Sequence, residues 1–224
     1  MKNALKHPTQ RIFPSVMAQN QENLDFLFKK LSGVAKMLHL DIADGKAVPN
    51  TSLWFPFKLS KKFSYNAHLM IQKPERWIEK NEKKYGKQIE FYIVQREEID
   101  DPREYIQFCR KKKKAVAFAL KPETPIATLK PFLPEIDYVL ILTVHPGFYG
   151  AEYLPEQLQK VRELKRLNQK VKIIVDGGMN PENIGDATRA GTDYFISGSY
   201  LSKSDEPKKA YKKLVEVVKG VSES

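Results

Sequence analysis

The 224-residue sequence predicts one (β/α)8 barrel, the TIM-barrel architecture, spanning residues 1–224 as a single domain. Short apolar runs rich in β-branched and aromatic residues alternate with amphipathic stretches, a pattern typical of a parallel α/β fold. Eight such units average about 28 residues each, which suits one strand and one helix. Polar residues gather where the apolar runs end, as they do at the mouth of a closed barrel rather than along an open sheet.

Eight apolar runs are the predicted strands: Ile12–Met17, Lys36–Ile42, Ser64–Met70, Ile89–Val94, Ala115–Leu120, Tyr138–Val144, Lys172–Val175 and Tyr194–Ser197. Six amphipathic stretches are the predicted helices: Glu22–Leu31, Glu75–Tyr85, Pro102–Lys112, Pro155–Leu167, Asn183–Ala190 and Pro207–Lys219. After Asp44, the residues Pro49, Trp54 and Pro56 predict a long loop followed by a short helix. Residues 1–10 are expected to be a loosely held lead-in.

The sequence is basic: Lys and Arg number 38, Asp and Glu 27, and the net charge is +11. The densest basic run, residues 110–114, lies at the carboxyl end of the predicted helix that begins at Pro102, where cations complement the helix dipole. There is no RNA-binding signature, zinc-finger spacing or basic stripe interleaved with aromatics. We therefore expect no nucleic-acid partner, and the positive excess favours anionic substrates instead.

Cys109 is the only cysteine, so the chain forms no internal disulfide. No uninterrupted apolar stretch reaches membrane-spanning length, and the first residues lack a signal core. We expect a soluble, cytoplasmic protein with no membrane partner.

The pattern His39-Leu40-Asp41 is the sharpest local signal, because strand residues two apart point to the same side. His68 ends the next strand and Asp176 the seventh, so all four side chains are expected at the barrel mouth. Each histidine taken alone fits a hydrogen-bonded polar group at a rim. The four together favour a divalent metal ion, Zn²⁺ or Fe²⁺ foremost, with Mn²⁺ and Co²⁺ as further candidates.

Glycines mark the loops after the last three strands, at Gly147 and Gly150, at Gly177 and Gly178, and at Gly198 before Ser199. Barrels of this kind commonly bind phosphate with backbone N–H groups of these loops, and glycine permits the close approach. A single glycine pair is more often turn chemistry, but three in successive loops favour a phosphate site.

Two further features allow two interpretations each. The strand-end segments Lys121-Pro122 and His145-Pro146 fit ordinary X-Pro loop punctuation as well as a substrate role. The aromatic stripe Trp54, Phe55, Phe57 and Phe63 fits core packing or a subunit contact. We expect a homo-oligomer.

Together these motifs resemble the ribulose-phosphate 3-epimerase family from Phe13 to Leu201. Pro14–Met17 is similar to its PSIL, His39–Gly45 with Val48–Asn50 to its HVDVMDGxFVPN, Ala67–Met70 to its VHLM, and Thr143–Gly150 to its SVNPGFGG. Val175–Asn180 is similar to its VDGGVN, and Ala190–Gly191 with Ser197–Ser199 to its AGAD…AGS. The ordered set is far more specific than any single motif.

The resemblance implies a TIM barrel of the ribulose-phosphate-binding type and a metal-dependent C3 epimerase of a ketose phosphate, most directly D-ribulose 5-phosphate to D-xylulose 5-phosphate. It implies that His39, Asp41, His68 and Asp176 bind the metal, and that Asp41 and Asp176 are the acid/base pair. The implied substrate- and phosphate-binding residues are Ser15, His68, Gly147, Gly150, Gly177, Gly178, Gly198 and Ser199.

Several positions depart from the family pattern. Ala43 and Leu142 stand where the family has methionine, Lys121 and His145 where it has other polar residues, Tyr149 where it has glycine, and Gln95 where it has histidine. These departures leave three hypotheses open: the pentulose epimerase, an epimerase of another ketose phosphate such as a hexulose 6-phosphate, and a non-catalytic phosphosugar-binding relative. A protein that only binds needs no acid/base pair, which favours the enzymes.

Overall fold

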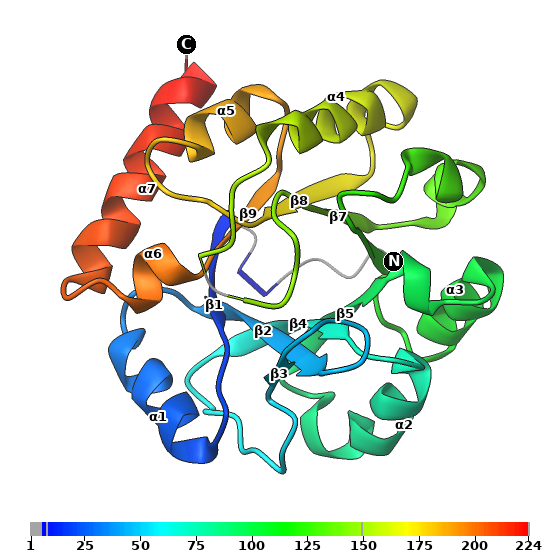
Figure 1. Cartoon of the computed structure of the whole chain (residues 1–224), viewed down its shortest axis with the longest axis horizontal. Helices are drawn as coiled ribbons and strands as arrows, with labels where there is room; N and C mark the ends of the chain where they lie inside the picture. Colours follow the sequence, from blue (N-terminus) through cyan, green and yellow to red (C-terminus); the bar gives the residue numbers. More distant parts are fainter. Residues whose placement is uncertain (1–5, 8, 149, 224) are drawn as a thin grey trace.

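The computed structural model describes residues 6–7, 9–148 and 150–223, and in these residues parallel strands close into a barrel (Figure 1). Each barrel strand pairs with its neighbour in parallel, and β1 pairs with both β2 and β9, which closes the ring. The predicted closed barrel is thereby confirmed. The strands are β1 (Ile12–Val16), β2 (Met37–Asp44), β4 (Ser64–Met70), β5 (Ile89–Gln95), β6 (Ala117–Leu120), β7 (Tyr138–Leu142), β8 (Lys172–Asp176) and β9 (Tyr194–Ser197).

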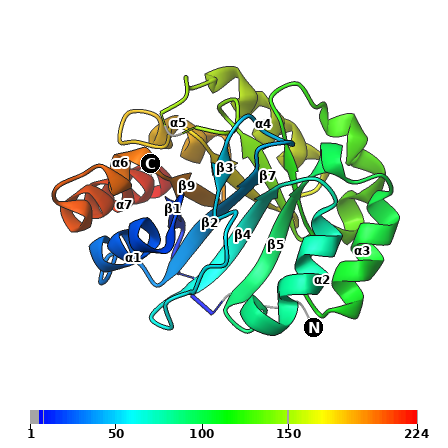
Figure 2. The same cartoon turned by 60° about the horizontal axis from the view of Figure 1, so that its bottom comes forward.

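Helices surround the barrel, and Figure 2 shows α1, α2 and α3 outside the strands. Local sequence explains where several begin. Asn20 caps α1 by accepting a hydrogen bond from the Asn23 backbone N–H, and Asp101 caps α3 just before Pro102. The helices are α1 (Gln21–Lys30), α2 (Pro74–Tyr85), α3 (Pro102–Lys111), α4 (Leu158–Leu167), α5 (Ile184–Arg189), α6 (Ser199–Ser202) and α7 (Pro207–Glu223). No helix in the described part of the chain is long and apolar enough to span a membrane.

Strand alternation divides the apolar core into two parts. On β5, Tyr92 and Val94 pack outward in the large cluster between barrel and helices, whereas Phe91 and Ile93 belong to the smaller cluster inside the barrel. Gln95 continues the inner face at the carboxyl end of β5 and is fully buried. The interior therefore changes from apolar at the bottom to polar at the mouth.

The connection after β2 differs from the prediction. It contains β3 (Thr51–Ser52), which pairs antiparallel with Ala43 and Asp44, and the expected short helix is absent from residues 45–63. Two prolines, Pro49 and Pro56, limit helical hydrogen bonding in this segment. For the aromatic stripe, core packing is confirmed at Phe57 and Phe63, because both side chains are buried.

The connection between β6 and β7 contains 3-10 segments, Ile126–Thr128 and Lys130–Glu135, in place of an α-helix. Pro125, Pro131 and Pro134 lack backbone N–H donors, which keeps the hydrogen-bonded runs short. The lead-in contacts the barrel bottom, where the Gln10 side chain donates to the carbonyls of Ile12 and Met37.

Candidate active site

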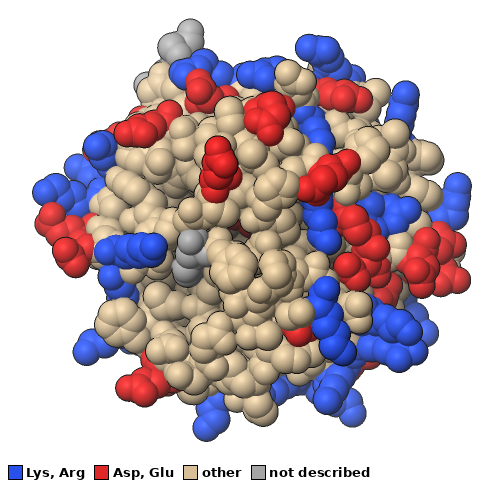
Figure 3. All heavy atoms as spheres, viewed as in Figure 1, with Lys and Arg blue, Asp and Glu red and all other residues tan. Residues whose placement is uncertain are grey.

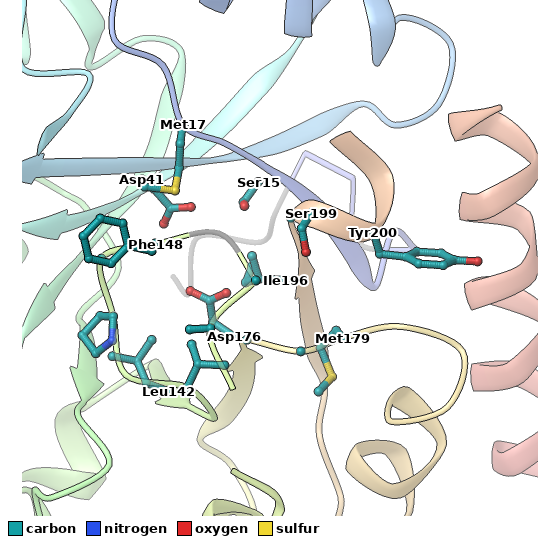
Figure 4. A pocket seen from close by; sticks show the side chains of 18 of the residues that line it. Ser15, Met17, Asp41, Leu142, Phe148, Asp176, Met179, Ile196, Ser199 and Tyr200 are labelled. Carbon is teal, nitrogen blue, oxygen red and sulfur yellow. The ribbon is translucent and has the colours of Figure 1, made fainter. Parts of the chain in front are cut away.

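A cavity of ≈ 300 Å³ opens at the carboxyl ends of the strands. Figure 4 shows the Asp41 and Asp176 carboxylates turned into it, with the Ser15 and Ser199 hydroxyls nearby. Its lining includes the predicted site residues Ser15, Asp41, Gly147, Gly150, Asp176, Gly177, Gly178, Gly198 and Ser199. His39 and His68 do not line the cavity, because both are fully buried behind the carboxylates.

Three strands bring the two histidines and two aspartates together. Residues 39 and 41 share the inner face of β2, Asp41 pairs in register with His68 on β4, and Asp176 ends β8. His39 Nε2 lies 3.2 Å from Asp41 Oδ1 and 3.9 Å from Asp176 Oδ2. His68 Nδ1 lies 3.9 Å from each of the same two oxygens. One atom from each side chain lies within 4.8 Å of the other three.

This group can hold a divalent metal ion. The buried nitrogens His39 Nε2 and His68 Nδ1 have no hydrogen-bond partner, and both face the carboxylates. A spacing of 3.9 Å is too long for a hydrogen bond, yet two donors about 2.1 Å from a shared ion lie at most about 4.2 Å apart. Imidazole and carboxylate donors suit a transition-metal ion.

Two buried amides contact the far sides of the imidazoles. Asn66 Oδ1 accepts a short hydrogen bond from His39 Nδ1. In the neutral ring the proton is then on Nδ1, and the lone pair of Nε2 points toward the carboxylates. The Gln95 amide lies 3.5 Å from His68 Nε2. Both amides come from the inner faces of β4 and β5.

Burial and charge perturb the protein groups of this cluster. Burial, reinforced by the neighbouring His39, lowers the pKa of His68 to about 3, so this imidazole is neutral. Burial and the Asp41 charge raise the pKa of Asp176 to about 7. At His39 burial disfavours the cation, but the Asp41 carboxylate outweighs it and the pKa is raised. A bound cation would favour the deprotonated form of each ligand.

The loop after β8 is held by side chains from neighbouring elements. Thr143 Oγ1 donates to the carbonyls of Asp176 and Gly177, and Asn183 Nδ2 donates to the Gly178 carbonyl. Gly177 and Gly178 have φ of 114° and 67°, a region that disfavours other residues. A Cβ at Gly178 would lie 2.6 Å from the Tyr153 ring. The loop bounding the cavity is therefore fixed in shape.

The departures from the family pattern have separate surroundings. Ala43 packs with Val48 and Met70, and Leu142 lines the cavity. Lys121 Nζ donates to the Ala47 carbonyl over 3.3 Å. His145 is exposed and lies 2.9 Å from Glu123 Oε1. Tyr149 lies outside the described residues.

Sequence reasoning missed several residues of this site. Lys203, after α6, is the one cation that lines the cavity in the described chain, and its Nζ has no hydrogen bond or ion pair there. The centre of this face is largely uncharged, and both basic and acidic side chains lie around it (Figure 3). Met17 and Met179 add apolar walls (Figure 4). Met17 and Met179 lie inside the motifs Pro14–Met17 and Val175–Asn180, and Lys203 follows the Gly198-Ser199 motif, so the signal in the sequence came from the motifs and not from these side chains.

A (β/α)8 barrel with glycine loops and paired carboxylates at its mouth is typical of enzymes that act on sugar phosphates. The chain matches the ribulose-phosphate 3-epimerase family over residues 11–202 and belongs to that family. It is an isomerase of the racemase and epimerase class that acts on carbohydrates.

Individual relatives carry the same family name. The chain is 31% identical to the cytoplasmic isoform of ribulose-phosphate 3-epimerase from Oryza sativa subsp. japonica, covering 94% of this chain and 95% of that protein. It is 30% identical to ribulose-phosphate 3-epimerase from Mycobacterium tuberculosis, covering 88% and 87%. Among solved structures, 3-keto-L-gulonate-6-phosphate decarboxylase from Vibrio cholerae shares the fold with a TM-score of 0.68 at 10% identity, covering 95% of this chain and 98% of that one.

Proposed function

We propose that this protein is a metal-dependent epimerase that inverts C3 of a ketose phosphate, with D-ribulose 5-phosphate and D-xylulose 5-phosphate as its two epimers. The observation that carries the proposal is the pair of carboxylates, Asp41 from β2 and Asp176 from β8, that turn into one cavity (Figure 4). Epimerisation beside a ketone requires a proton to leave one face of the carbon and return on the other. Two carboxylates on separate strands suit that requirement.

Each aspartate serves one face of the substrate. From one epimer, Asp176 takes the C3 proton, the C3–H electrons move into an enediolate, and Asp41 delivers a proton to the opposite face. In the reverse direction the two exchange roles. In the metal-free site the pKa of Asp176 is raised to about 7, and a bound cation favours the carboxylate form that accepts the proton.

His39, Asp41, His68 and Asp176 hold the metal, for which the mixed nitrogen and oxygen donors favour Zn²⁺ or Fe²⁺ over Mn²⁺ and Co²⁺. The ion supplies Lewis-acid stabilisation of the negative charge that develops on the substrate oxygens. With the ion bound, His39 and His68 are neutral donors below the cavity, and Asn66 and Gln95 contact their far nitrogens. Met17, Leu142 and Met179 keep water from the reacting carbon.

The phosphate lies at the side of the cavity bounded by the glycine loops. Gly147, Gly150, Gly177, Gly178 and Gly198 give access to backbone N–H groups, and Ser199 adds a hydroxyl. Lys203 supplies the positive charge that these neutral groups lack. Ser15, on the inner face of β1, contacts the sugar between this end and the carboxylates.

A longer ketose phosphate such as a hexulose 6-phosphate is the second candidate. Ala43, which is smaller than the methionine of the family pattern, packs against Met70, and Met70 lines the cavity. A homo-oligomer and a cytoplasmic location stay predictions. The exposed side chains of Phe26 and Trp54 are apolar surface that a second copy would cover, and sedimentation analysis measures the assembly.

The test is incubation with several ketose phosphates in deuterated water, with and without a chelator. Deuterium at C3 and formation of the second epimer identify reaction and substrate together. Exchange restricted to a hexulose 6-phosphate would favour the second candidate. Tight binding of every sugar without exchange would identify a non-catalytic relative.

A further inference from the structure

The two ring nitrogens of His68 face different polar groups, and these groups determine which nitrogen carries the proton. Its Nδ1 faces the Asp41 and Asp176 carboxylates, 3.9 Å from each, and has no hydrogen-bond partner. Its Nε2 faces Gln95, the one hydrogen-bond partner of this ring among the described residues. Both side chains are fully buried, so no solvent replaces a missing partner.

The orientation of the Gln95 amide decides which nitrogen of His68 carries the proton. An amide oxygen toward Nε2 accepts a proton from Nε2–H and leaves the Nδ1 lone pair free. An amide N–H toward Nε2 requires the opposite tautomer, with a proton on Nδ1 between the two carboxylates, and that tautomer binds no metal through Nδ1.

The oxygen-first orientation gives the buried Gln95 oxygen a partner. Gln95 Oε1 is buried without a hydrogen-bond partner, while Gln95 Nε2 is the atom 3.5 Å from His68 Nε2. Turning the amide over about its last bond brings Oε1 to Nε2–H, so the orphaned oxygen and the ring proton satisfy each other. Asn66 already accepts from His39 Nδ1 in the same manner.

We propose that Gln95 is a positioning residue that accepts the Nε2 proton of His68 and thereby presents the Nδ1 lone pair to the metal site. The proposal rests on the proposed metal-dependent function. Gln95 touches neither substrate nor metal, and it acts through the imidazole. The residue thus fixes both the tautomer and the ring orientation of a buried ligand.

Two substitutions test whether the Gln95 side chain acts on His68 Nε2 as a hydrogen-bond acceptor or as a donor. Gln95→Glu keeps an oxygen at Nε2 but removes the amide N–H, whereas Gln95→Met keeps the approximate shape and removes both. Ile93→Val is the matched control, because Ile93 lies two residues earlier on the same inner face of β5, in register with His68, and its substitution removes packing volume beside the ring without removing a polar group. Unfolding midpoints of the metal-free proteins report any general damage.

Metal affinity is measured by chelator competition with Zn²⁺ and by the visible spectrum of Co²⁺-loaded protein. We expect Gln95→Met to weaken binding by about tenfold or more, the range found when partners of metal-binding histidines are removed. Gln95→Glu and Ile93→Val should bind as tightly as the wild type or tighter. A smaller loss in Gln95→Met, or a tenfold loss in Gln95→Glu, overturns the proposal.

The tautomer gives a readout that needs no metal. In metal-free wild type, ¹⁵N shifts of the His68 ring should show a protonated Nε2 and an unprotonated Nδ1, and Gln95→Met should shift population toward the other tautomer. An unchanged tautomer in Gln95→Met overturns the proposal. Failure of the proposed function looks different: the wild type itself would bind no metal, or His68→Ala would bind it normally.

Discussion

His39 Nε2 and Asp41 Oδ1 lie 3.2 Å apart on the inner face of β2, with Leu40 between them in sequence and packed on the opposite side. Strand alternation alone creates this pair, and the in-register neighbour His68 on β4 extends it. The third element is β8, whose Asp176 completes the group across the barrel. Because these four side chains come from three strands of one closed barrel, a metal ion bound to them would require little rearrangement.

Loss of one imidazole should empty the metal site. Gently purified wild type should contain about one divalent ion per chain, and His68→Ala should lower that occupancy sharply, because three donors remain for a transition-metal ion. His145→Ala is the matched control, since His145 is exposed and lies outside the group. Elemental analysis measures both, and unchanged occupancy in His68→Ala would remove His68 from the ligand set.

Removing the cation at the glycine rim should weaken phosphate recognition. Lys203→Gln should raise KM for a ketose phosphate by about tenfold, equivalent to about 1.4 kcal/mol, and leave kcat nearly unchanged. The effect should shrink as salt is added, because Lys203 is exposed. Lys208→Gln, on α7 and outside the cavity lining, controls for the loss of net charge. Equal KM increases in both variants would show a general charge effect.

The bottom of the barrel should show acid-dependent stability through Asp193. Burial opposes its ionisation, but hydrogen bonds from Lys165 and from the Ile173 backbone N–H outweigh burial and lower its pKa. Because the folded pKa lies below the unfolded value of about 3.9, the stabilisation is complete above that value and is lost as pH falls through the folded pKa.

Asp193→Asn should therefore lower the free energy of unfolding at pH 7 by about 2 kcal/mol, with the deficit narrowing below about pH 4. Denaturant titrations at pH 7 and below about pH 4 measure the free energy of unfolding of both proteins. Asp186→Asn is the control, because its pair with Arg189 is exposed and should contribute under about 0.5 kcal/mol. A deficit that stays constant with pH would mean that the Asp193 charge is not its source.

Much of the barrel was predictable because its periodicity is local. Apolar runs located every barrel strand, amphipathic stretches located the longer helices, and the His39/Asp41 alternation indicated a metal-binding face. The two-residue strand Thr51–Ser52 and the four-residue helix Ser199–Ser202 were missed, since so short a segment carries no period. The helix expected before β4 was wrong, because prolines kept that segment irregular.

The contacts that support the site residues were harder to predict from the sequence. Asn66 and Gln95 appear in sequence as polar residues in largely apolar strands. Register places Asn66 beside His39, and only the side-chain contacts show which ring nitrogen each amide meets. Lys203 is one of many surface lysines until the turn at α6 brings it beside Gly178 and Ser199. Such pairings depend on tertiary geometry rather than on any local pattern.

Solvent exchange at C3 by the two aspartate variants tests the two-carboxylate mechanism most directly. Metal-loaded wild type, Asp41→Asn and Asp176→Asn are incubated in deuterated water with each epimer separately, after metal content has been checked. The account predicts that net epimerisation falls by about 10²- to 10⁴-fold in both variants, while each still exchanges the C3 proton of one epimer only, without inversion. Interconversion by metal-loaded Asp176→Asn at near wild-type rate would contradict it.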